Sequence, residues 1–145
     1  MSFRSLPRFV HVLLAAAAAA ALMAAMPARA LDLTVEVSGA RSDKGFVSAA
    51  LYNEVAGWMT QSFRTERVTA GASVRVVFRD LPAGRYALAV IHDENGNGKL
   101  ESNLMGMPTE AYGFSRGARA TLGPPKFEDA ALDIGGDTTV QVKLQ

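Results

Sequence analysis

A strict alternation of apolar and polar residues at two distant places constrains the fold of this chain more than any other feature. In LDLTVEV, residues 31–37, leucine or valine occupies every second position, and TTVQVKL, residues 138–144, ends with the same alternation. Successive side chains of a β-strand point to opposite faces, so each segment has one apolar and one polar face. We expect both segments to be strands that cover a core with one face and meet water with the other.

Five further segments are predicted to be strands, because they are short and lie between clusters of turn-forming residues. They are GFVSAALY (45–52), SFRTERVT (62–69), SVRVVF (73–78), RYALAVI (85–91) and FEDAALDI (127–134). RYALAVI is apolar on both faces, which is typical of a central strand. In the turn DLPAG before it, Gly84 is expected to need a positive φ. About seven strands in roughly a hundred residues predict an all-β fold, a single antiparallel β-sandwich of immunoglobulin-like or transthyretin-like architecture.

The first thirty residues have the composition of an export signal. Arg4 and Arg8 precede a long uncharged apolar stretch, and Ala-Arg-Ala at 28–30 supplies the small residues that a signal peptidase needs. We expect residues 1–30 to be a signal peptide cleaved after Ala30, and residues 31–145 to form one domain in the periplasm or outside the cell. A retained membrane helix is the alternative, because the apolar stretch is long enough to span.

Export changes the charge of the chain. Residues 1–30 contain three arginines, so 15 basic residues become 12 against 14 acidic ones, and the formal net charge becomes −2. No basic run remains, which argues against nucleic acid as a partner. The chain has no cysteine, so disulfides, thiolate zinc sites and cysteine nucleophiles are excluded.

The segment HDENGNGKL, residues 92–100, follows the predicted central strand and carries oxygen-bearing side chains at alternate positions. Such alternation is typical of an EF-hand calcium loop, which takes ligands from positions 1, 3, 5, 7 and 9 and has glycine at position 6. Counted in this way, the candidate metal ligands are Asp93, Asn95, Asn97, the Lys99 carbonyl and Glu101. The pattern predicts weak calcium binding, with a dissociation constant on the order of 10⁻⁴ to 10⁻³ M.

The closing carboxylate of an EF-hand loop is missing, because Leu104 occupies its position 12. Glu110 or Asp129 would have to supply that ligand from elsewhere. The alternative interpretation is a polar turn that needs no ion, since Asn, Asp and Gly all favour turns through local hydrogen bonds or positive φ.

Other catalytic chemistry has little support in the sequence. His92 is the only histidine after residue 30, and neither Ser102 nor Ser115 lies in the glycine pattern of a nucleophile elbow. We expect His92 to be a structural residue at the end of a buried strand. Glu101 and Glu110 could form an acid and base pair, although a domain of this size would be unusually small for a glycosidase. No phosphate-binding loop or dinucleotide motif is present.

A long connection from Asp93 to about Lys126 is predicted to have no strand and to be ordered, because it is rich in large apolar residues. Two of its aromatic residues, Tyr112 and Phe114, together with Trp58 from an earlier connection, are candidates for a ligand-binding surface. The alternative is that these rings close one end of the core, since a small domain needs its large side chains for burial.

Several of these segments, taken together, resemble a bacterial family of exported proteins called domain of unknown function 2141. The likeness is carried by DLPAGRYALAVIHDENGNGKLESNLMGMPTEAYGFSRGA (80–118) and GPPKFEDAAL (123–132). It extends over essentially all of residues 31–145, with small departures at Glu101 and Met107. The resemblance implies a β-sandwich of the transthyretin-like or carboxypeptidase-regulatory-like kind. It implies no activity, because none is assigned to the family.

We therefore expect a non-enzymatic binding or structural module of the bacterial envelope, with no cofactor except weakly bound calcium. Its partner would be an envelope protein, a peptide or a glycan, with no nucleic acid and no membrane span after signal cleavage. The alternative is a small metal- or carboxylate-dependent hydrolase or lyase that uses the long loop. In a binding module the protein supplies every metal ligand, whereas an enzyme leaves one position for water.

Overall fold

The computed structural model describes residues 29–145, so the predicted export signal lies almost wholly outside the described residues. This part of the chain contains eight strands and two short helical segments. They are β1 (Leu31–Ser38), β2 (Phe46–Tyr52), β3 (Arg64–Thr69), β4 (Ser73–Leu81), β5 (Gly84–Asp93), β6 (Tyr112–Phe114), η1 (Ser115–Gly117), α2 (Phe127–Ala130), β7 (Leu132–Ile134) and β8 (Thr138–Lys143). Neither helical segment is long and apolar enough to cross a membrane.

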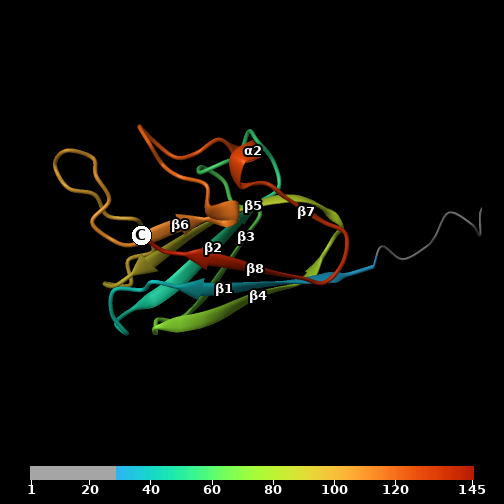
Figure 1. The fold of residues 1–145 in the computed structure, drawn as a ribbon, viewed down its shortest axis with the longest axis horizontal. Coiled ribbons are helices and arrows are strands. Elements are labelled where there is room, and N and C mark those ends of the chain that lie inside the picture. The colour runs from blue at the N-terminus through green and yellow to red at the C-terminus, as the bar shows by residue number, and fades with distance from the viewer. Residues whose placement is uncertain (1–28) are drawn as a thin grey trace, which may run out of the picture.

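The strands form two sheets (Figure 1). One sheet has the order β4-β1-β8, and the other has the order β3-β2-β5-β6, with β7 paired to the start of β5. The predicted all-β sandwich is confirmed. Every strand of the described residues pairs with another strand inside residues 31–143, so residues 31–145 form both layers.

One strand pair departs from the expected antiparallel arrangement. β1 and β8 run parallel, with Val35 opposite Val140 and Val37 opposite Val142, whereas the remaining pairs are antiparallel. A parallel pair requires a long crossover, and here the chain from β2 to β7 provides it. Alternation within each strand is the same in both arrangements, so the sequence did not distinguish them.

Two expected element boundaries were wrong. FEDAALDI is not one strand, because Phe127–Ala130 forms the helix α2 before β7 begins at Leu132. The helix buries Phe127 and Ala130 on one face and exposes two acidic residues in its first turn. Negative charge there interacts favourably with the positive end of the helix dipole. The connection expected to have no strand contains β6, whose three residues pair with the middle of β5.

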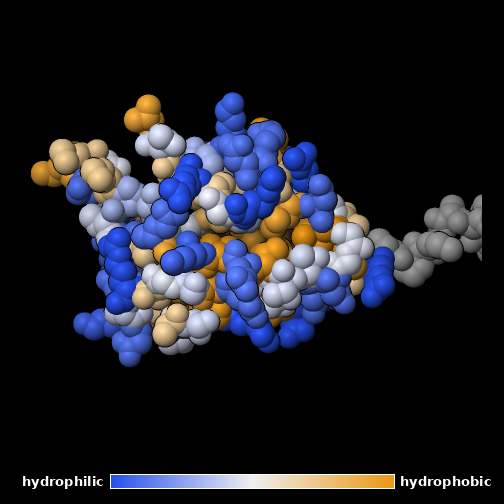
Figure 2. All heavy atoms as spheres, viewed as in Figure 1, coloured by the Kyte–Doolittle hydropathy of each residue, from blue (hydrophilic) through white to orange (hydrophobic). Residues whose placement is uncertain are grey.

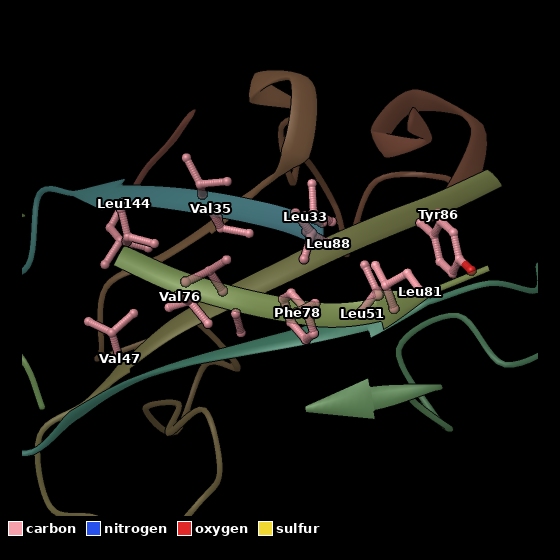
Figure 3. Packing of buried hydrophobic residues seen from close by; sticks show 14 of the residues in the cluster. Leu33, Val35, Val47, Leu51, Val76, Phe78, Leu81, Tyr86, Leu88 and Leu144 are labelled. Carbon is pink, nitrogen blue, oxygen red and sulfur yellow. The ribbon is translucent and has the colours of Figure 1, made fainter. Parts of the chain in front are cut away.

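The main core lies between the two sheets (Figure 3). The alternating apolar residues of β1 and β8 point into it together with those of β2, β4 and β5. Its fully buried members include Leu33, Val35, Val47, Leu51, Val76, Phe78 and Leu88. Full burial of one such side chain contributes about 1.5–3 kcal/mol, so this layer is the main source of stability.

β5 is buried on both faces, as predicted. Tyr86, Leu88 and Val90 belong to the main core. Ala87 and Ala89, on the opposite face, lie in a second cluster with Tyr52, Phe114, Phe127, Ala130 and Ala131. The small alanine side chains let the aromatic rings and α2 lie directly on this face, and this second cluster supports the long connection.

The prediction for Gly84 was wrong. Gly84 is not among the glycines with positive φ, and the residue of the turn that adopts this conformation is Asp80, with φ 55°. The Asp80 N–H donates to Asp32 Oδ1 at 3.2 Å, which holds the backbone in its left-handed conformation. A Cβ added at Gly84 would lie 3.5 Å from the Tyr86 ring, an ordinary contact distance.

Candidate functional site

The candidate calcium loop begins at the buried end of the central strand. Asp93 is the last residue of β5, and it lies opposite Phe46 of β2. Its side chain is fully buried, and the guanidinium of Arg67 lies 3.9 Å from its Oδ2. The Arg67 guanidinium also lies 4.1 Å from the centre of the Phe46 ring, so one cation partners both the carboxylate and the ring.

The Asp93 carboxylate holds the loop by accepting hydrogen bonds from the loop's backbone N–H groups. Its Oδ1 accepts hydrogen bonds from the N–H groups of Gly96 and Asn97, at 2.8 and 3.1 Å, and its Oδ2 accepts one from Gly98 at 2.8 Å. Gly96 and Gly98 have φ near +76° and +77°, a conformation that suits glycine and aims their N–H groups at the carboxylate. These three backbone hydrogen bonds and the nearby guanidinium pair the buried carboxylate and organise the turn.

Three of the predicted ligands meet at a single point. The side-chain amide nitrogens of Asn95 and Asn97 donate to the same oxygen, Oε1 of Glu101, at 2.8 and 2.9 Å. Their amide oxygens accept from the backbone N–H groups of Asn97 and Lys99, at 3.0 and 2.8 Å. All three side chains lie at the exposed surface, so the point where they converge is accessible to solvent.

Glu110 has a role that the sequence analysis missed. Its side chain is only 6% exposed, its Oε1 accepts from the Glu94 N–H at 3.1 Å, and its Oε2 accepts from the Glu101 N–H at 3.2 Å. One carboxylate therefore joins the two ends of the loop. The signal in the sequence was the position of Glu110, a single carboxylate just before the apolar YGF segment. It was missed because a charged residue at the start of a strand is usually exposed.

His92 is fully buried, and two backbone groups hold its ring. Nδ1 accepts from the Arg41 N–H at 3.2 Å, and Nε2 donates to the Lys44 carbonyl at 2.9 Å, so the proton sits on Nε2. Ser115 Oγ donates to the Ala130 carbonyl and accepts from the Leu88 N–H. The histidine and this serine each join two segments of backbone.

A calcium ion fits this loop only after a local change. If the amides of Asn95 and Asn97 turned over, their oxygens would face Glu101, where a hard cation prefers oxygen donors. The Lys99 carbonyl would add a ligand, while Asp93 and Glu110 remain occupied by backbone donors. Among residues 29–145, no three Asp, Glu, His or Cys side chains are grouped so as to hold a metal. The donor set therefore consists mainly of neutral oxygens.

Beyond the loop, two segments project from the sandwich (Figure 1), and we call residues 100–108 the first arm and residues 118–124 the second arm. The first arm is a small hairpin, in which Asn103 N–H donates to the Met107 carbonyl at 2.9 Å. The Asn103 side chain accepts from the N–H groups of Met105 and Met107, at 2.9 and 3.0 Å. The second arm is anchored next to Pro125, whose carbonyl accepts from the Trp58 indole N–H at 2.7 Å.

The two arms enclose a groove of about 620 Å³ with a largely apolar lining. Tyr112 and Phe114 lie in it with Met59, Leu100, Met105, Met107, Leu122 and Pro124. Trp58, the third aromatic candidate, lies in the second cluster, with its ring centre 4.9 Å from that of Tyr52 and 5.9 Å from that of Phe127. Burial raises the pKa of the Tyr52 phenol in this cluster. Tyr112 and Phe114 thus line one groove, although Phe114 is only 6% exposed, whereas the partly buried Trp58 packs against the second cluster and does not line the groove.

Comparison with known families identifies the chain. A family model described as an uncharacterized protein conserved in bacteria (DUF2141) matches residues 35–142. The chain belongs to this family. The matched range extends from β1 to β8 and includes the loop and both arms. No curated protein and no solved structure matches the chain, and the transthyretin-like description of the fold remains a prediction.

Proposed function

We propose that this DUF2141 domain is a non-enzymatic binding module, exported to the bacterial envelope, whose binding surface is the groove between its two arms. The observation that carries the proposal is the presence of large apolar side chains at the ends of hydrogen-bonded arms. Leu104 and Leu122 are as exposed as in an extended peptide, at 107% and 104%, and Met105 and Met107 are 80% and 59% exposed.

Folding alone does not account for these exposed residues. The two cores are complete without them, and turn geometry favours Asn, Asp and Gly at such positions over Leu and Met. Exposed apolar groups gathered around one groove are typical of an interaction surface. Methionine adapts its shape to different partners, which suits a binding surface better than a rigid core.

The calcium loop is the second part of the proposal. Bound calcium would join Asn95, Asn97 and Glu101 at the base of the first arm, and the fixed loop would then restrict the motion of that arm. The convergence of these three side chains on one point supports this role. The largely neutral donor set implies weak affinity, on the order of 10⁻⁴ to 10⁻³ M, at which calcium would be bound only outside the cytosol.

Site-specific photo-crosslinking in cells that export the protein tests the binding surface. A photoreactive amino acid in place of Met107 should form an adduct with an envelope component, because this side chain lines the groove. The same amino acid in place of Thr139, on the exposed face of β8, is the control and should form none. Equal labelling from both positions, or none from Met107, would contradict the proposal.

A further inference from the structure

We propose that the occupant of the binding surface is an anionic lipid bilayer, into which the tips of the two arms insert while nearby cations contact the head groups. The inference rests on the proposed function, since it names the partner of the same surface. Two independent observations carry it, namely the shape of the apolar surface and the distribution of charge along the chain.

The most exposed apolar residues stand on two projecting tips, one on each of the arms that enclose the groove. Figure 2 shows two separate hydrophobic tips extending beyond the body of the domain, with hydrophilic side chains between them and the sandwich. Leu104 and Leu122 at the arm tips have more than 100% relative exposure. A folded protein partner would need a separate pocket for each tip, whereas the boundary between head groups and acyl chains surrounds any protruding apolar group.

Hydrogen bonds also hold the arms in a conformation that exposes these side chains before binding. The Asn103 side chain and the backbone bonds of the hairpin fix the turn that carries Leu104 and Met105. The Trp58 indole fixes the end of the second arm. Because the tips are held by hydrogen bonds, insertion requires little ordering of the chain, and this reduces the entropic cost of binding.

Charge is distributed unevenly along the chain between residues 99–126, which include both arms with their flanking residues, and the rest of the domain. Residues 99–126 contain four basic and two acidic residues, a net charge of +2, while the remainder of residues 31–145 has eight basic and twelve acidic residues, a net charge of −4. The four cations, Lys99, Arg116, Arg119 and Lys126, are all exposed. One of the two carboxylates, that of Glu110, is buried and bonded to backbone N–H groups.

A cationic region on an otherwise acidic domain would orient the molecule with its arms toward an anionic surface. The groove between the arms is then a space into which an acyl chain or the glycerol region of a lipid can pack against Tyr112 and Phe114. Tyrosine suits this depth because its ring is apolar and its hydroxyl group is polar.

Cosedimentation with lipid vesicles tests the inference, with residues 31–145 as the protein. The probes are vesicles of equimolar phosphatidylglycerol and phosphatidylethanolamine, and vesicles of phosphatidylcholine alone. We expect binding to the anionic vesicles to be at least about tenfold stronger, since each cation near such a surface strengthens binding about fivefold. High salt should remove most of this difference.

Three variants, each with a matched control, locate the contact. Each of Leu104→Ser and Leu122→Ser should weaken binding about tenfold, because each removes one inserted side chain. Val55→Ser, at an exposed apolar residue that does not line the groove, should change nothing. Arg119→Gln should weaken binding to anionic vesicles about fivefold, whereas Arg85→Gln, at the opposite end of β5 from the first arm, should not.

Absence of binding to the anionic vesicles, or equal loss in the Leu122→Ser and Val55→Ser proteins, would overturn the inference. Circular dichroism melts of all variants should coincide, because the altered side chains are exposed. If Met107 crosslinks to an envelope protein in cells while the purified domain does not bind vesicles, the proposed binding surface stands and the proposal of a lipid partner is wrong. If neither assay gives a signal, both proposals fail.

Discussion

At the scale of single residues, three buried polar side chains decide the shape of the candidate site. Asp93, His92 and Glu110 each have their hydrogen-bonding atoms paired with backbone groups. A buried polar group whose partner is removed costs about 1–3 kcal/mol, which exceeds the net gain from forming the bond. Asp93 and Glu110 therefore specify the conformation of the loop after β5, and His92 that of the neighbouring connection between β1 and β2, more strongly than they add stability.

Glu110→Gln should destabilise the domain by about 1–3 kcal/mol, because the amide keeps one oxygen acceptor and turns a donor toward a partly buried N–H. The groups affected are the Glu94 and Glu101 N–H groups, which both donate to this carboxylate. Urea unfolding followed by fluorescence measures the change. Glu54→Gln, at an exposed position, is the control and should stay within about 0.5 kcal/mol of the wild type. Equal unfolding midpoints for the two variants would show that Glu110 does not join the loop ends.

At the scale of elements, the central strand determines where the loop and arms lie. β5 ends at Asp93, where the loop begins, and its middle pairs with β6, which leads into the second arm. Both arms therefore emerge next to one strand that is buried on both faces. A rigid support of this kind fixes the positions of loops whose own sequences favour no regular element.

Calcium should stabilise the wild-type domain through the Asn95, Asn97 and Glu101 side chains. An ion that binds only the folded state adds RT ln(1 + [L]/Kd), about 1.4 kcal/mol at ten times Kd, which raises the melting temperature by several degrees. Magnesium should do less, because its smaller octahedral shell suits this loop poorly. Thermal melts with chelator and with millimolar calcium provide the measurement.

The structure changes the choice of variant for this test. Asp93→Ala would remove the acceptor of three backbone N–H groups, so it would destabilise the loop with or without calcium. Glu101→Gln should abolish the calcium shift and leave the melt in chelator nearly unchanged, since this side chain is exposed. Glu94→Gln, whose side chain contacts Ser42 instead, should keep the shift. Identical wild-type melts with and without calcium would establish the loop as an ion-free turn.

At the scale of the whole molecule, the fold begins where export cleavage is predicted. Leu31 is the first residue of β1, is 1% exposed and lies opposite Leu81, whereas Arg29 and Ala30 are exposed. Cleavage after Ala30 would therefore leave every strand intact.

The intact mass of the protein recovered from the cell envelope should correspond to a chain that starts at Leu31. The physical reason is that signal peptidase needs an accessible, extended segment with small residues, and Ala28 and Ala30 supply these next to the folded domain. Treatment of intact cells that releases periplasmic contents should release the same mass. Recovery of the full 145-residue chain from the inner membrane would instead identify the apolar stretch as an anchor.

The sequence by itself determined most of the strands, the inward faces of β1 and β8, and the double burial of β5. Each of these depends on the local period of apolar residues, which is visible within a few positions. It also marked the loop at residues 93–101, because turn-forming and oxygen-bearing residues act on their own neighbours. Family membership followed from long motifs in a fixed order.

Only the tertiary structure decided which distant groups meet. The parallel pairing of β1 with β8, the junction made by Glu110 and the hydrogen bond from the Trp58 indole to the Pro125 carbonyl join residues far apart in the chain. Helix α2 forms because Phe127 and Ala130 find a surface on the outer face of β5. The two arms follow different strands, β5 and β6, and line one groove only in the folded domain. Such contacts depend on the packing of complete elements, since alternation specifies which face of a strand is buried and not what covers it.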